Sequence, residues 1–196
     1  MEIIEREVGS HPYNKMEWPI VRRIIHATAD FDFAGENKIV FHKDAITSGI
    51  NALKNGCSII VDVNGVIGGL NKQNPKDFGN NLICNISDPD LAERAKQENK
   101  TRAQMSMRIA ASEMNGGILV IGNAPTALLE VIKMIREGVT KPALVIGIPV
   151  GFVSAEESKE ELQTVDVPFI TNTGRKGGSS CAASIVNALF KLLREN

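Results

Sequence analysis

The stretch SIIVDV, residues 58–63, is a short run rich in β-branched residues that shows no regular alternation of polar and apolar positions. Similar runs follow along the chain at Leu82–Ile86, Ile118–Ile121, Ala143–Ile148 and Pro168–Thr171. Strands that are apolar on both faces are typical of a parallel sheet covered by helices on its two sides. We therefore expect residues 58–63 to form the first strand of a parallel sheet.

Amphipathic helical patterns separate these strands. They cover Asp88–Gln97, Thr101–Met114, Pro125–Glu137, Ser154–Leu162 and Ser179–Leu193. The first of these helices is expected to begin with Asp88 as the capping residue and Pro89 in the first turn. The third is expected to begin at Pro125 and to end before Gly138. Two earlier helices are predicted at Glu17–Ala29 and Asp44–Asn55. The alternation predicts an α/β fold, doubly wound, with a mainly parallel sheet and helices on both faces.

Composition limits the domain count and the partners. With 196 residues, 43% of them hydrophobic, and no linker, the chain has the size of a single domain spanning residues 1–196. A net charge of −1 gives no overall field for nucleic acid or a membrane surface, so an anionic ligand must meet local cations. No run of eighteen apolar residues predicts a membrane span, and a terminus charged from residue two does not resemble a signal peptide.

Cysteine usage bears on the compartment and on metal binding. Cys57, Cys84 and Cys181 are odd in number and show no CxxC spacing, which favours a reducing, cytoplasmic setting. Neither HxxxH nor HxH occurs, so no metal site is predicted. The chain also lacks GxxxxGK[ST], a GxGxxG after a strand and GxSxG, which disfavours nucleotide hydrolysis, a Rossmann cofactor and a serine hydrolase.

Ligands of doubly wound sheets bind outside the carboxyl ends of the strands. Small and polar residues are concentrated in the segments that follow the predicted strands, at 64–69, 122–126, 149–152 and 171–179. Glycine lets a backbone approach a ligand closely, and helix N-termini at Pro125, Ser154 and Ser179 would point N–H groups into the same crevice. We therefore expect the functional site at this edge of the sheet.

Three features of these segments are candidate ligand contacts, each with a structural alternative. GRKGGSS, residues 174–180, is typical of an anion-binding turn but also of a solvated loop. GNAPTAL, residues 122–128, suits a ligand loop or a plain helix entry capped by Asn123. Arg102 stands at a helix start, where a cation opposes the helix dipole, and this favours a ligand contact.

The stretch VRRIIHATADFDF, residues 21–33, contains the chemically most distinctive histidine. On the predicted helix, Arg22 and Arg23 lie four and three residues before His26, so all three side chains share a face. The alternative is a satisfied, partly buried histidine. Asp30 and Asp32 would point to one side of a strand-like exit, where they could orient the imidazole or cap the turn.

Four segments in register, RRIIHATADFDFA (22–34), GNAPTAL (122–128), PVGFVSAEESKEEL (149–162) and PFITNTGRKGGSSCAASIVNAL (168–189), resemble the precorrin-8X methylmutase family, also called cobalt-precorrin-8 methylmutases. The resemblance runs in order over nearly the whole chain. It implies a flavodoxin-like fold, a homodimer, no cofactor, and an isomerase of cobalamin biosynthesis. The implied reaction moves a methyl group from carbon eleven to carbon twelve of a corrin precursor, giving hydrogenobyrinate or cobyrinate.

The resemblance also implies residue roles. His26 matches the family's catalytic histidine, which would protonate the macrocycle near the migrating methyl and take the proton back afterwards. Arg23 and Arg102 match family positions expected to contact the substrate. A tetrapyrrole rimmed with carboxylates needs scattered cations and small or polar groups. By their location, further substrate-binding residues are expected to be Asn123, Thr126, Lys159, Arg175, Lys176 and Gly177.

Some alternatives stay open at this stage. A non-catalytic corrinoid-binding protein or a scaffold protein of the same pathway is the competing function, although the DxHxxG turn of corrinoid carriers is absent. The family's substrate-contacting serine falls just ahead of Met1, so either the start is truncated or the protein binds without that group. Neither the presence of cobalt in the substrate nor the subunit that supplies residues 174–179 to each site follows from the residues.

Overall fold

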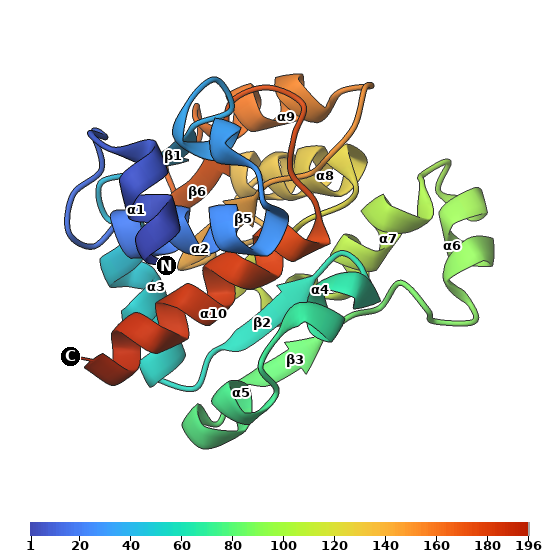
Figure 1. Cartoon of the computed structure of the whole chain (residues 1–196). Coiled ribbons are helices and arrows are strands. Elements are labelled where there is room, and N and C mark those ends of the chain that lie inside the picture. The colour runs from blue at the N-terminus through green and yellow to red at the C-terminus, as the bar shows by residue number, and fades with distance from the viewer. Residues whose placement is uncertain (196) are drawn as a thin grey trace.

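A computed structural model describes residues 1–195 and contains one six-stranded sheet (Figure 1). The strands are β1 (Ile39–Phe41), β2 (Ser58–Val61), β3 (Asn81–Ile83), β4 (Ile118–Ile121), β5 (Leu144–Gly147) and β6 (Phe169–Asn172). Their spatial order is β1-β6-β5-β4-β2-β3. Only β1 runs antiparallel, against β6 at one edge, and the other neighbouring pairs are parallel.

The five parallel strands have the flavodoxin-like order. Counted from β2, they lie in space as second, first, third, fourth and fifth, which is the 2-1-3-4-5 arrangement. The chain winds outward in both directions from β2 and β4, so the topological switch point lies between these two strands. The predicted fold class is confirmed, and the switch point marks where the carboxyl edge opens into a crevice.

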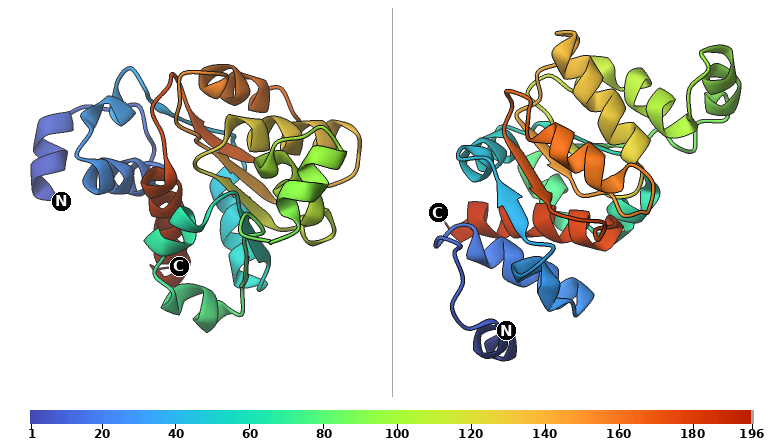
Figure 2. Two further views of the ribbon diagram at one scale, coloured as in Figure 1. Left: turned by 90° about the vertical axis from the view of Figure 1, so that its right-hand side faces the viewer. Right: turned by 90° about the horizontal axis from the view of Figure 1, so that it is seen from above.

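Helices cover both faces of the sheet (Figure 2). One face carries α2 (Trp18–Thr28), α3 (Ala45–Lys54), α4 (Asn64–Gly69) and α10 (Ser179–Glu195), with α1 (Glu2–Val8) against α2 and α5 (Gln73–Phe78) against α3. The other carries α7 (Arg102–Ile109), α8 (Pro125–Arg136) and α9 (Ala155–Leu162). α6 (Leu91–Gln97) packs on α7, and two 3-10 turns are η1 (Phe31–Ala34) and η2 (Ala111–Glu113).

Strand β4 shows why the sheet needs helices on both sides. Its four side chains are fully buried, with Ile118 and Val120 in the hydrophobic core on the α10 face and Leu119 and Ile121 in the core on the α8 face. Successive strand residues point to opposite faces, so an all-apolar strand is stable only when both faces are covered. Each such side chain contributes about 1.5–3 kcal/mol on burial.

Most predicted elements are found with small shifts at their ends. β4 matches its prediction residue for residue, and α8 ends one residue before the predicted Glu137. Predicted helix 101–114 divides into α7 and η2. The helix expected to be capped by Asp88 begins only at Leu91, because Asp88 accepts a hydrogen bond from the N–H of Asp90 (2.9 Å) and closes a turn ahead of it.

Helix α4 was not expected, since its sequence NGVIGG reads as a glycine-rich loop. One of its glycines is required by packing. A Cβ on Gly69 would lie 2.7 Å from the Cβ of Ala183, so this residue must be glycine for α4 to lie directly on α10. Tertiary packing thus overrides the low helix propensity of the segment.

Helix α6 and the first turn of α7 form an arm that projects from the rest of the molecule, while the remainder of α7 packs against α8 (Figures 1 and 2). Leu91, Ala95 and Met105 give this arm a small hydrophobic core of its own. Within residues 1–195, no helix has both the length and the apolarity that crossing a bilayer requires.

Candidate active site

The predicted site residues lie along one edge of the molecule, the carboxyl edge of the parallel strands. The segments that follow β2, β4, β5 and β6 end there, and α4, α8, α9 and α10 begin there. In the left view of Figure 2 the side of the molecule with α7 and the first turn of α10 faces the viewer, with α2 (blue) to one side of α10 (red) and α7 (green) to the other. The segments predicted to carry the site therefore meet at one edge of the sheet, and this edge is the candidate site.

His26 lies in the last turn of α2 and is exposed, so the alternative of a satisfied, partly buried histidine is wrong. The apolar face of α2 is buried against α10, which turns His26 and Arg23 outward. Both residues line a pocket of about 270 Å³ whose far wall is formed by Gly69, Ser180 and Asn187. The pocket combines an imidazole, a guanidinium and a hydroxyl at the carboxyl edge.

Asn187 helps to shape this pocket. Its side-chain oxygen accepts from the N–H of Asn71 (2.9 Å), and its side-chain nitrogen donates to the carbonyl of Gly69 (2.9 Å). These bonds fasten the end of α4 to α10. Ser184, also in the pocket wall, donates to the carbonyl of Cys181 (2.8 Å). With these groups engaged, the pocket offers a ligand mainly Arg23, His26 and Ser180.

Arg22 does not share the outward face with His26, contrary to the prediction. Its guanidinium pairs with Glu5 of α1, and the other oxygen of Glu5 accepts from the indole N–H of Trp18 (2.8 Å). α1 is thereby fixed to α2. Only Arg23 of the two arginines is left beside the histidine in the pocket.

Asp62, directly after β2, organises the loop after β4. Its carboxylate is fully buried and accepts from the backbone N–H groups of Gly122 (3.0 Å), Asn123 (2.8 Å) and Ala124 (2.8 Å). Burial raises the pKa of Asp62, while these three hydrogen bonds lower it in part. The predicted cap by Asn123 is wrong, because Ala124 is the N-cap residue and Asp62 supplies the acceptor from another strand. Asn123 itself is exposed.

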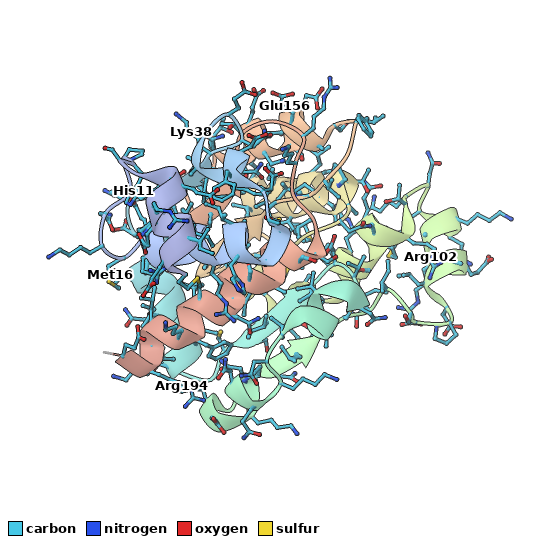
Figure 3. All side chains as sticks on the ribbon, in the orientation of Figure 1. His11, Met16, Lys38, Arg102, Glu156 and Arg194 are labelled. Carbon is cyan, nitrogen blue, oxygen red and sulfur yellow. The ribbon has the colours of Figure 1, made fainter. Side chains whose placement is uncertain are left out.

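Thr126 and Arg102 lie at the α7 side of this edge. The hydroxyl of Thr126 is 3.2 Å from that of Thr101, the N-cap residue of α7. Arg102 donates to the carbonyl of Ile86 (2.7 Å), which holds its side chain on the arm. In Figure 3 Arg102 lies on the side opposite His11 and α1. Arg102 is therefore on the carboxyl edge but is not part of the pocket around His26.

The buried side chain of Lys159 holds the loop between β6 and α10 from the protein interior. This side chain is only 1% exposed and donates to the side chain of Asn172 (3.1 Å) and the carbonyl of Lys176 (2.7 Å). Burial lowers the pKa of Lys159 to about 8. Its burial argues against the predicted substrate contact, because the ammonium supports the loop from inside.

Glycine at position 177 is required by a close backbone approach. A Cβ there would lie 2.3 Å from the carbonyl oxygen of Ile148, and the N–H of Gly178 donates to that same oxygen (3.0 Å). Lys176 binds Asp30 (2.7 Å) and Asp32 (2.5 Å), and these hydrogen bonds raise its pKa. Arg175 is exposed.

Larger hollows exist at the opposite edge of the sheet. One of about 460 Å³ lies before β5 and β6, between Val139 and Thr164, and one of about 520 Å³ lies before β2, beside Asn55 and Ser58. Size alone would favour them, but they are at the amino ends of the strands. The position of the His26 pocket at the carboxyl edge, with an imidazole and a guanidinium, outweighs its smaller volume.

Comparison with known proteins identifies the family of the chain. The family model described as precorrin-8X methylmutase matches residues 1–192. The chain belongs to the precorrin-8X methylmutase family. Methylmutases are isomerases, so the family match assigns this chain to the isomerase class of enzymes. Within residues 1–195, no group of three His, Cys, Asp or Glu side chains could hold a metal ion.

Relatives within the precorrin-8X methylmutase family are similar over almost the whole chain. The cobalt-precorrin-8 methylmutase of Priestia megaterium is 52% identical, over 96% of this chain and 83% of its own. That of Leptospira interrogans is 50% identical, over 97% and 89%. The crystal structure titled precorrin-8x methyl mutase from Thermus thermophilus superimposes with a TM-score of 0.91 at 39% identity, covering 99% of this chain and 93% of that one.

Two residues of this candidate site are not predicted from the sequence. Asp62 was included in a predicted strand, although a carboxylate at the end of an apolar run is a signal of a buried, hydrogen-bonded charge. Ser180 belongs to the stretch predicted as an anion-binding turn, and in the structure it is exposed on the first turn of α10, in the pocket wall.

Proposed function

We propose that the chain catalyses the transfer of a methyl group from carbon eleven to carbon twelve of precorrin-8X or cobalt-precorrin-8. The observation that carries this proposal is the exposed His26 beside Arg23 in a pocket at the carboxyl edge of a flavodoxin-like sheet. Membership of the family supports the isomerase class. The two relatives at about half identity are both named cobalt-precorrin-8 methylmutases, which favours the cobalt-containing substrate.

His26 would act first as an acid and then as a base. Its imidazolium protonates the macrocycle near the migrating methyl group, which draws electron density away and lets the methyl shift between adjacent carbons. The imidazole then takes the proton back, so the enzyme and the proton count return to their starting state. An imidazole exchanges protons readily near neutral pH, and an exposed side chain at a pocket wall can reach a bound ligand.

The carboxylates of the substrate would meet the cations of the carboxyl edge. Arg23 lies beside His26, and Arg175 is exposed on the loop before α10. Guanidinium groups bind carboxylates in a bidentate manner, which fixes orientation as well as charge. Asn123, Thr126 and Gly177 would complete the contacts from the loops after β4 and β6.

We propose further that the working form is a homodimer, located in the cytoplasm. Arg102 lies outside the His26 pocket on the projecting arm, so its expected substrate contact is best explained by a site shared between two copies. Phe152 and Val153, 88% and 81% exposed beside that edge, are apolar groups that a second copy would cover. The three free cysteines support a reducing compartment.

The test is conversion of the substrate. The protein is incubated with precorrin-8X or its cobalt form, and formation of hydrogenobyrinate or cobyrinate is followed by absorption. His26→Ala should bind substrate yet lose turnover by about 10²–10⁴-fold. His42→Gln is the matched control, because His42 lines a different hollow, beside Thr47, and should keep full activity.

Two outcomes would reject the proposal. Full activity of His26→Ala would remove the histidine from the mechanism. Tight binding of the corrinoid by the native protein without conversion would favour a non-catalytic corrinoid-binding or scaffold protein instead.

A further inference from the structure

Lys176 lies between two carboxylates that come from the segment after the His26 helix. Its Nζ is 2.7 Å from Oδ2 of Asp30 and 2.5 Å from Oδ2 of Asp32. Lys176 is 146 positions from Asp30 and 144 positions from Asp32 in the chain. We call Lys176, Asp30 and Asp32 the Lys176 cluster.

The backbone of Lys176 is fixed independently of its side chain. Its carbonyl oxygen accepts from the buried ammonium of Lys159 (2.7 Å) and from the side chain of Asn172 (2.9 Å). Two residues later, Gly178 donates to the carbonyl of Ile148 at the end of β5 (3.0 Å). The base of the lysine side chain is therefore anchored to the sheet.

The other end of the cluster is continuous with α2. Asp30 also accepts the N–H of Asp32 (3.0 Å) and thereby caps η1. Ala29, which joins Asp30 to α2, has a left-handed φ of 54° and donates to the carbonyl of Ile25 (2.8 Å). Only three residues separate His26 from Asp30, so a displacement of Asp30 moves the last turn of α2.

The charge of the cluster makes it a poor carboxylate binder. One ammonium is shared by two carboxylates, so the cluster as a whole is negative. A carboxylate of the substrate brought to Lys176 would lie beside Asp30 and Asp32 and be repelled by both. Exposed arginines such as Arg175 suit that task better.

We propose that Lys176 is a positioning residue, which holds the end of the His26 helix in place through Asp30 and Asp32 and does not bind the substrate. This inference rests on the proposed role of His26. Because the three side chains are between 28% and 49% exposed, the ion pairs are screened and contribute little to overall stability. Breaking them therefore changes the position of His26 more than it changes folding.

A double-mutant cycle tests the proposal in the full-length protein. The variants are Lys176→Met, Asp30→Asn with Asp32→Asn, and the triple variant. Asparagine at position 30 keeps the cap on η1. We expect Lys176→Met and the double aspartate variant each to lower kcat about tenfold with KM within about twofold, and the triple variant to be no worse than either. Lys176→Arg should restore most of kcat.

Lys133→Met is the matched control, since Lys133 pairs with Glu137 on the exposed face of α8 and should leave both constants unchanged. The proposal is overturned if Lys176→Met raises KM at unchanged kcat while the aspartate variants behave as wild type, because that pattern identifies a substrate contact. Additive losses in the triple variant would also overturn it.

A second measurement does not depend on turnover. Amide hydrogen exchange of residues 24–29 reports the last turn of α2, and Lys176→Met should accelerate it while exchange in α8 stays unchanged. Unchanged exchange at residues 24–29 overturns the proposal. Absence of conversion by the wild-type protein would instead count against the proposed function, and the exchange result would still decide the positioning role.

Discussion

The carboxylate of Asp62, at the end of β2, accepts a hydrogen bond of 2.8 Å from the backbone N–H of Asn123, at the end of β4. These two strands flank the topological switch point, so the bond closes the sheet at the place where doubly wound proteins bind ligands. Asp62 thus sets the course of the loop that carries the predicted contacts Asn123 and Thr126.

Asp62→Asn should destabilise the protein by about 2 kcal/mol, because an amide cannot accept all three N–H groups and turns its own NH₂ toward at least one of them. Urea unfolding measures the loss. Asp77→Asn, at a partly exposed position paired with Arg194, is the control and should change stability by less than about 1 kcal/mol. Equal effects of the two substitutions would contradict the role of Asp62.

Gly177→Ala should lower stability by about 2–3 kcal/mol and reduce activity, since its Cβ would collide with the carbonyl oxygen of Ile148 and displace the loop before α10. Thermal unfolding and kcat/KM are the measurements. Gly68→Ala has open space at its Cβ and should stay within about 0.5 kcal/mol of wild type. A fully stable, active Gly177→Ala protein would show that the loop is not held so closely.

Lys159 predicts a pH dependence of stability. Burial lowers its folded pKa to about 8 from 10.5, so between these values the unfolded chain binds more protons. The contribution of Lys159 to stability therefore increases as pH rises through this window, by up to about 1 kcal/mol per pH unit. The neutral amine still has two N–H groups for Asn172 and the carbonyl of Lys176. The free energy of unfolding is measured with denaturant at pH 8, 9 and 10. The value for wild type should rise relative to that for Lys159→Met as pH increases, and a difference that does not change with pH would contradict this prediction.

Docking of α1 depends on Glu5, which binds both Arg22 and the indole of Trp18. Glu5→Ala should loosen α1 and shift the emission of Trp18, the single tryptophan of the chain, to longer wavelength. Glu2→Ala, at an exposed position of the same helix, is the control and should leave the spectrum unchanged. An unaltered spectrum in Glu5→Ala would mean that Ile4, the buried residue of α1, is sufficient for docking.

Local patterns predicted much of the site, and they failed where a partner came from a distant segment. The helical pattern predicted α2, because an amphipathic helix has one apolar face whatever it packs against. The partner of Arg22 was not predictable in this way, since Glu5 comes from α1. Asn123 is placed in the chain like a capping residue, yet the acceptor is supplied by Asp62, 61 residues earlier.

The sequence by itself determined the fold class and the family, because strand period, helix period and motif order are local properties of the chain. It also predicted the edge of the sheet at which the site is expected. Only the tertiary structure decided which charged groups are available to a ligand. Lys159 and Lys176 read as substrate cations in the sequence, but Lys159 is buried beneath the loop and Lys176 is held by Asp30 and Asp32. The physical reason is that burial and ion pairing depend on residues brought together by folding, and these decide whether a charge faces a ligand or supports the protein.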